Sequence, residues 1–182
     1  MADNQDSISP DLARWIEQQH VFFVATAPLA ASGHVNCSPK GMDAFRVLGP
    51  HDVAYIDLTG SGVETIAHLK ENGRIVFMFC AFDGAPRVVR LHGTGGAVQP
   101  DTSRFEELRE RFPNYVGTRA IVTATITRIS QSCGYAVPRL DYVDDRDALE
   151  KWATKKGADG LDRYRREKNA LSIDGLPALA TD

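Results

Sequence analysis

Side chains that can donate hydrogen bonds to an anion gather in the run HVNCSPKG, at residues 34–41. In an extended strand His34, Asn36 and Ser38 share one face, and Lys40 follows directly after a proline. Such an edge suits an anionic or hydroxyl-rich ligand. Polar alternation is equally typical of a strand face turned to solvent, so both interpretations stay open.

A second group of candidate donors lies in DLTGSGVETIAHLKENG, at residues 57–73. Its glycine turn leads into an expected helix, whose first backbone N–H groups are available to a phosphate. The spacing GxGxxT matches neither the dinucleotide fingerprint nor a P-loop. Ser61 and Glu64 also have capping-box spacing, which favours the interpretation that the turn only starts a helix.

Other residues that could carry chemistry are scattered along the chain. Arg90, in the β-rich run RVVRLHG, is either a buried anion partner or, as we favour, part of a salt bridge at the barrel rim. The histidines lack HxxxH spacing and no GxSxG elbow is present, so neither zinc hydrolysis nor a serine triad is supported. Asp144, Asp145 and Asp147 fit a helix start better than a metal site.

Composition narrows the class of protein. The 182 residues are 43% hydrophobic and carry a net charge of -3, which fits one domain with a buried core and no basic surface for nucleic acid. Cys37, Cys80 and Cys133 are far apart, as expected for reduced thiols. No basic, apolar leader and no run of roughly 18 apolar residues is present, so we expect a cytoplasmic protein outside the membrane.

Short strands must position the candidate residues. The β-rich runs occupy residues 21–27, 34–38, 44–48, 52–58, 74–80, 87–98 and 119–130. Helices are expected from Ser9, from the glycine turn to Asn72-Gly73, and at Ser103 and Glu106, which have capping-box spacing. Roughly six strands with two inserted helices favour a closed or partly closed antiparallel barrel. The charged tail is helical in pattern and broken at Gly157 and near residues 172–177.

Several separated blocks resemble, in the same order, the pyridoxamine 5'-phosphate oxidase-related, FMN-binding split-barrel family. They are FFVATA, HVNCSPKG, AYIDLTGSGVETIAHLKENGRIVFMFCAF, RVVRLHGTG and the tail, which is similar to an uncharacterised branch. The resemblance covers residues 15–177 and implies a mainly β protein with flanking helices, a six-stranded antiparallel split barrel that forms a homodimer with FMN at the interface. We accordingly expect a barrel domain at 1–140 and a helical extension at 141–182 that packs on the barrel or the partner.

The resemblance also nominates cofactor-binding residues, position by position. They are Asn36, Ser38, Lys40, Asp57, Leu58, Thr59, Ser61, Thr65 and, more loosely, Arg90. FMN would carry the hydride or electron chemistry, which explains the missing catalytic side chain. The expected function is therefore an FMN-dependent oxidoreductase acting on a small molecule, with NAD(P)H as a candidate electron donor. The alternatives are a flavin carrier or sensor without turnover, and an interaction barrel with an empty pocket.

Two departures from the family pattern shape this expectation. Glu64 and Thr65 stand where the well-known oxidases have an Arg-Lys pair for the phosphate. Phosphate affinity therefore either comes from Lys40, backbone amides and another arginine, or is weak. The chain ends in SIDGLPALATD where true oxidases have an Arg-Leu-His type segment for their substrate, so oxidation of vitamin B6 is not expected.

Overall fold

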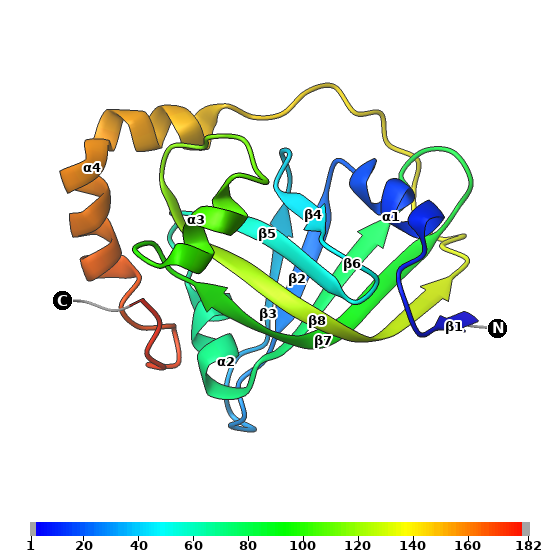
Figure 1. Ribbon diagram of the computed structural model, residues 1–182, viewed down its shortest axis with the longest axis horizontal. Coiled ribbons are helices and arrows are strands. Elements are labelled where there is room, and N and C mark those ends of the chain that lie inside the picture. The colour runs from blue at the N-terminus through cyan, green and yellow to red at the C-terminus, as the bar shows by residue number, and fades with distance from the viewer. Residues whose placement is uncertain (1–2, 180–182) are drawn as a thin grey trace.

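The computed structural model describes residues 3–179, whose central element is a curled antiparallel sheet (Figure 1). The strands are β1 (Asp3–Gln5), β2 (Phe22–Thr26), β3 (Asn36–Lys40), β4 (Phe45–Val47), β5 (Asp52–Leu58), β6 (Arg74–Cys80), β7 (Val88–Val98) and β8 (Thr118–Ser132). Seven of them follow the order β3-β2-β6-β7-β8-β5-β4, and β1 pairs with β8. The sheet is a split barrel with β3 and β4 at the ends of this path, which confirms the expected fold class.

The strand count exceeds the expected six because every β-rich run forms a strand and β1 adds another. Even the short β4 keeps a defined register with β5, from Phe45 opposite Tyr55 to Val47 opposite Val53. The run expected at 34–38 lies two residues later, at Asn36–Lys40, because pairing with β2 begins only at Asn36.

Four helices flank the sheet: α1 (Pro10–Glu17), α2 (Glu64–Asn72), α3 (Ser103–Arg109) and α4 (Ala148–Lys168). Ser9 caps α1 as expected, since its Oγ accepts the Leu12 N–H at 3.2 Å. Helix α3 is capped by Thr102 instead of Ser103, because the Thr102 hydroxyl accepts the Phe105 N–H at 3.1 Å. The predicted boundary was one residue late.

The ends of α2 differ in how well the sequence predicted them. Gly73 ends the helix in the left-handed region, with φ 72°, as expected. The prediction of a capping box at its start is wrong, because Val63 is the N-cap and no side chain accepts a hydrogen bond from the free backbone N–H groups. The Glu64 carboxylate accepts the Ile173 N–H at 3.4 Å instead of bonding back to the turn.

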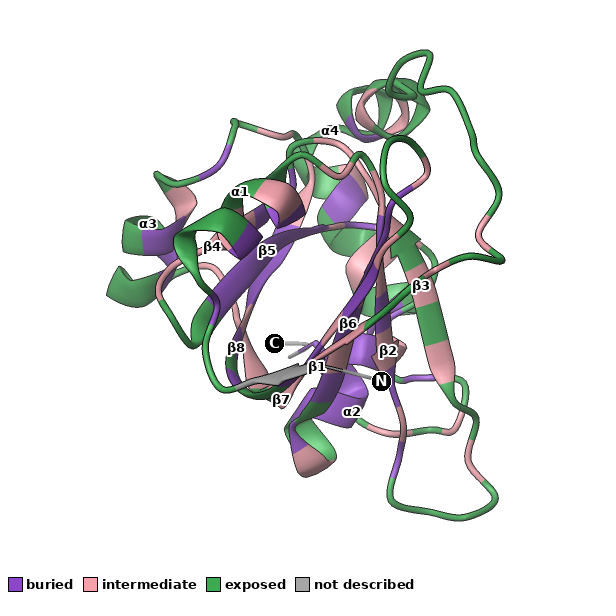
Figure 2. Ribbon diagram, turned by 90° about the vertical axis from the view of Figure 1, so that its right-hand side faces the viewer, coloured by how far each residue is buried: buried purple, intermediate pink, exposed green. Residues whose placement is uncertain are grey.

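Buried residues concentrate along the barrel strands and in the first part of α2, at residues 65–69, as the colouring in Figure 2 shows. The barrel interior holds an aromatic cluster of Phe22, Phe45, Tyr55, Phe77 and Phe79, with ring centroids of neighbouring pairs 5.0 to 6.1 Å apart. Such edge-to-face and offset pairs stabilise beyond the area they bury, by about 0.5–1.5 kcal/mol each. This cluster fixes the strands that frame the candidate site.

The C-terminal part of the chain returns to the barrel from outside. An extended segment, residues 133–147, crosses the molecule and leads to α4, which stands beside the barrel in Figure 1. Helix α4 bends at Gly157, whose φ of 67° interrupts the helical backbone at the expected break. Contacts at the end of α4, described below, join it to the barrel, while a domain boundary at residue 140 stays a prediction. No helix within residues 3–179 is long and apolar enough to cross a membrane.

Candidate functional site

A cavity of about 370 Å³ lies between β3, the end of β5 and the start of α2. One part of its wall is apolar and includes Met42, Ala44, Ile56, Leu58 and Leu149. The other part is polar and includes Asn36, Ser38, Lys40, Glu64, Thr65 and Arg119. This size and mixture of surfaces are typical of small-molecule sites.

The polar edge of β3 faces this cavity. Asn36, Ser38 and Lys40 are half-buried and line the wall, while Cys37 and Pro39 between them are exposed. This placement favours a ligand-facing strand over a strand face turned only to solvent, and the role of these residues in binding stays a prediction. Because β3 is an edge strand, it also tolerates a proline without losing a ladder hydrogen bond.

Hydrogen bonds fix the side chains along this edge. The Asn36 amide donates to the Thr65 hydroxyl at 3.0 Å, and the Ser38 hydroxyl donates to the Asn36 amide oxygen at 3.1 Å. The Thr26 hydroxyl lies 2.9 Å from Nδ1 of His68, and the Asn36 amide reaches the same hydroxyl at 3.4 Å. Burial lowers the pKa of His68, so its ring is neutral in this network.

Asp57 lies behind the wall and holds two cations in place. Its carboxylate is only 1% exposed, and it accepts from Lys40 Nζ at 3.0 Å and from Arg119 Nε at 2.7 Å. Burial acts to raise the pKa of Asp57, but the charges and hydrogen bonds of Lys40 and Arg119 outweigh it, so the pKa lies below its usual value. The group is therefore an ion-paired carboxylate that orients the two cations.

Arg119 connects the cavity to the C-terminal part of the chain. Its Nη1 donates to the side-chain oxygen of Asn169 at 3.0 Å, and its Nη2 donates to the carbonyl of Gly62 at 2.8 Å. The Asn169 amide donates in turn to the carbonyl of Gly60 at 2.9 Å. The end of α4 therefore fixes the glycine turn that forms one side of the cavity.

Four nominated residues do not line this cavity: Asp57, which lies behind its wall, and Thr59, Ser61 and Arg90. Thr59 is buried, and its hydroxyl donates to the Gly117 carbonyl at 2.7 Å and accepts from Arg165 Nε at 2.9 Å, so it holds the turn itself. Ser61 is exposed on that turn. Arg90 pairs with Ser130 near the end of β8, whereas the cavity is formed by the start of β8, so the sheet register places this arginine elsewhere.

Sequence reasoning missed Arg119 and Asn169. Arg119 opens an apolar strand, and an arginine in such a run has to be paired if it is buried, which was a usable signal. Asn169 lies in a charged, helical tail and carried no signal in the sequence. Its role depends on how the tail folds back onto the barrel.

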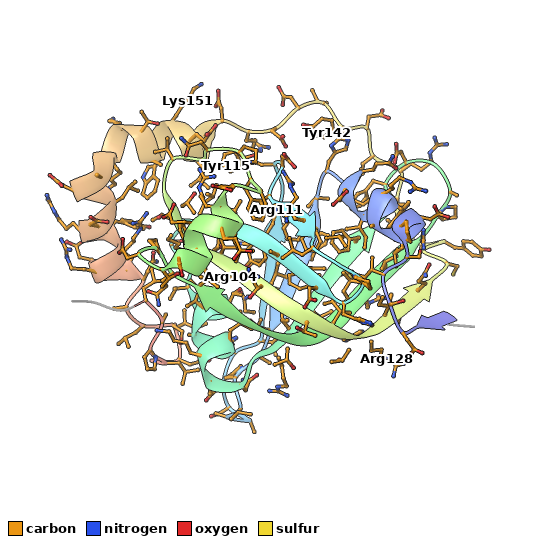
Figure 3. All side chains as sticks on the ribbon, viewed as in Figure 1. Arg104, Arg111, Tyr115, Arg128, Tyr142 and Lys151 are labelled. Atoms are coloured by element: carbon orange, nitrogen blue, oxygen red, sulfur yellow. The ribbon has the colours of Figure 1, made fainter. Side chains whose placement is uncertain are left out.

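A second cavity, of about 780 Å³, adjoins the first through residues 39–42, which line both. Tyr142, which is labelled in Figure 3, belongs to the extended segment. Its ring stacks on the ring of His20, with the two ring centroids 3.6 Å apart. Both residues line this cavity, together with Phe82 and Leu140. Met42 has a φ of 63°, a left-handed conformation that is uncommon for a non-glycine residue and is often found at functional sites.

Within the described residues, no group of three or more histidine, cysteine, aspartate or glutamate side chains is arranged to hold a metal ion. Asp144 and Asp145 lie on the extended segment, and Asp147 precedes α4 and forms an ion pair with Lys151 at 2.5 Å. Asp147 is the N-cap residue of α4, but its side chain makes no capping hydrogen bond, so only its charge complements the helix start.

Comparisons with known proteins agree with this architecture. The family model for pyridoxamine 5'-phosphate oxidase matches residues 8–133. A pyridoxamine 5'-phosphate oxidase family protein from Aspergillus flavus, ustO, is 40% identical over 191 residues, which cover 96% of this chain and 76% of that protein.

Two crystal structures show the same fold at low identity. A variant of HupZ from Group A Streptococcus is 22% identical and has a TM-score of 0.54, covering 69% of this chain and 99% of that one. A protein from Lactobacillus delbrueckii, provisionally named a pyridoxamine 5'-phosphate oxidase, is 16% identical and has a TM-score of 0.53, covering 69% and 94%.

Proposed function

The chain belongs to the pyridoxamine 5'-phosphate oxidase family, and from that premise we propose that it is a flavin-dependent oxidoreductase, with FMN as its cofactor, that acts on a small molecule. The observation that carries the proposal is the cavity whose one wall is apolar and whose other wall presents Asn36, Ser38, Lys40 and Thr65. An aromatic ring system with a polyhydroxyl chain needs both kinds of surface.

The chemistry of the wall fits a flavin in most respects. Ala44, Ile56 and Leu58 offer an apolar surface to a planar ring. Asn36 and Thr65 are held by hydrogen bonds at fixed positions, which lowers the entropic cost of binding hydroxyl and carbonyl groups. The cavity offers less attraction to the flavin phosphate, because the cation nominated to bind it, Lys40, already forms an ion pair with Asp57.

A bound flavin would supply the hydride or electron transfer. The protein itself has to bind and orient the flavin and its substrate, and to shield them from water. Lys40 presents its ammonium beside the cavity, where it would donate a hydrogen bond to a carbonyl or hydroxyl group of a bound flavin. Asp57 keeps that ammonium in position from behind the wall. Leu58 and Met42 cover part of the cavity with apolar groups that exclude water.

The second cavity provides room for a substrate next to this site. It shares Pro39, Lys40, Gly41 and Met42 with the first, so a molecule bound there lies against the same turn. Its aromatic pair, His20 and Tyr142, offers a surface for a planar or apolar group. We propose that the substrate is a small molecule that carries such a group and binds in this second cavity.

A homodimer in the cytoplasm is part of the same proposal. Large apolar side chains on the extended segment that borders the second cavity are exposed, including Tyr135 at 82% and Val143 at 86%, and a partner subunit would cover such groups. Sedimentation of the purified protein measures its oligomeric state. A protein that is monomeric at all concentrations would contradict both the homodimer and a cofactor site at a subunit interface.

The absorbance spectrum of purified protein incubated with FMN tests the central proposal. We expect flavin bands that remain after gel filtration and bleach when NAD(P)H is added without oxygen. Protein that retains no flavin would refute the proposal. Bound FMN that no nicotinamide nucleotide reduces and no acceptor reoxidises would instead support the flavin carrier or sensor.

A further inference from the structure

The charges around the first cavity cancel. Three charged side chains line the wall, Lys40, Arg119 and Glu64, and Asp57 lies directly behind the two cations. Two positive and two negative groups leave no net positive charge for a phosphate. A dianion in this cavity therefore gains little from the surrounding charges.

Arg119 has few hydrogen-bond donors left for a ligand. Its side chain is only 5% exposed. Nε donates to Asp57, Nη1 donates to Asn169 and to Gly60 at 3.4 Å, and Nη2 donates to Gly62. A guanidinium has five N–H groups, so four of them already point at the protein. This arginine shapes the turn and does not replace the missing phosphate-binding pair.

Glu64 places a negative charge where a phosphate would otherwise be favoured. It is the first residue of α2, where backbone N–H groups and the helix dipole attract anions. Its carboxylate lies over the glycine turn, since a methyl group at Gly62 would come within 2.6 Å of Glu64 Oε2. Among the described residues Glu64 has no ion-pair partner, so no cation neutralises its charge beside the cavity.

We propose that this cavity recognises the ring and hydroxyl groups of a flavin but not its phosphate, so that riboflavin and FMN bind with similar affinity, and that Glu64 is the residue that sets this specificity. The proposal rests on the flavin function proposed above. Ring and chain contacts come from the apolar wall and from Asn36, Ser38 and Thr65, which both flavins use equally. The phosphate of FMN meets the carboxylate of Glu64, and the attraction of Lys40 is shared with Asp57.

Quenching of flavin fluorescence by the full-length protein tests this directly, with riboflavin and FMN titrated separately at low ionic strength. For the unmodified chain we expect dissociation constants that agree within about threefold. Glu64→Gln keeps the size of the side chain and removes its charge, so FMN affinity should rise by about three- to tenfold while riboflavin affinity stays the same. Glu64→Lys should increase the preference for FMN further. Added salt should reduce the gain in FMN affinity that both variants show, because screening weakens interactions between exposed charges.

Glu71→Gln is the matched control, because Glu71 lies in the last turn of the same helix and does not line the cavity. It should leave both affinities unchanged, and circular dichroism should show that all three variants are folded. FMN binding more than about tenfold tighter than riboflavin in the unmodified chain would overturn the inference. If the ratio of FMN affinity to riboflavin affinity is the same in both Glu64 variants as in the unmodified chain, Glu64 does not set the specificity. If neither flavin binds, the flavin function itself is refuted, which is a different outcome from binding with phosphate preference.

Discussion

The side-chain oxygen of Asn169 lies 3.0 Å from Nη1 of Arg119, and its side-chain nitrogen lies 2.9 Å from the carbonyl oxygen of Gly60. One buried amide, from the end of α4, therefore joins a barrel strand to the turn before α2. The candidate cavity depends on a residue that is 109 positions away from that turn in the chain.

Asn169→Ala should destabilise the protein by about 1–3 kcal/mol, because it leaves the Gly60 carbonyl and one Arg119 N–H without their partner. Flavin affinity should fall as well, since the turn would no longer be fixed. Urea unfolding and flavin titration measure the two effects. Asn114→Ala, an exposed site, is the control, and an equal loss in both variants would show that Asn169 has no special role.

Lys40→Met should weaken the binding of both flavins by about 1.5–3 kcal/mol, the contribution of a hydrogen bond to a charged group. The loss should be larger for FMN, because the wall around Asp57 and Glu64 becomes net negative. Fluorescence titration checks both affinities, and Lys70→Met, on the exposed side of α2, is the comparison. Unchanged affinities would leave the site without its cation.

Asp57 should make the folded state sensitive to acid. Its pKa is lowered in the folded protein, so its contribution to stability is present above the unfolded value near 3.8 and is lost as the pH falls through the folded value. Asp57→Asn should therefore be much less stable than the unmodified chain at pH 7, by about 3–5 kcal/mol for a broken buried pair. Urea unfolding at a series of pH values should show this difference shrinking below about pH 4. A difference that does not depend on pH would contradict the ion-paired state.

Gly73→Ala and Gly157→Ala should both destabilise the protein, for different reasons. Gly157 has φ 67° and ψ 174°, a region that is essentially limited to glycine, so an alanine there costs about 1–3 kcal/mol although no atom lies within 4 Å of the new methyl group. Gly73 has φ 72° and ψ -7°, in the left-handed region, which costs an alanine about 1 kcal/mol, and its new methyl group would also lie 2.8 Å from Thr94 Cγ2. Thermal unfolding of both variants, with Thr94→Ala added to Gly73→Ala, separates the clash from the backbone cost. If adding Thr94→Ala recovers none of the loss at Gly73, the Thr94 side chain moves aside without cost.

The strands and the inner face of the barrel could be predicted with few errors, because alternation of apolar and polar residues is a local property of the sequence. The run expected at 74–80 forms β6 without change, and the run at 52–58 forms β5. The predicted boundaries and caps were wrong where the contact that decides them is made by residues far away in the sequence. The shift of β3 to Asn36–Lys40 follows from its register with β2, and the failed capping box follows from Glu64 contacting Ile173.

For the site, sequence resemblance nominated the edge of β3 and the turn after β5, and the structure brings Asn36, Ser38, Lys40, Leu58 and Thr65 to one cavity wall. It nominated Arg90 as well, which lies elsewhere because the pairing of β7 with β8 decides its position. The sequence alone could not choose between a ligand-facing and a solvent-facing β3, because half-burial of its polar face depends on the distant elements that form the cavity.

The sequence by itself therefore determined the strands and helices of the barrel, since periodicity and turn signals act over a few residues, and its resemblance to the family nominated the residues that could bind a flavin. Only the tertiary structure decided what those residues do. Asp57 meets Lys40 from 17 positions away and Arg119 from 62, and these pairings cancel the charges on which phosphate binding would depend. The physical reason is that ion pairs and buried hydrogen bonds are set by strand register and by the return of α4, neither of which a local pattern encodes.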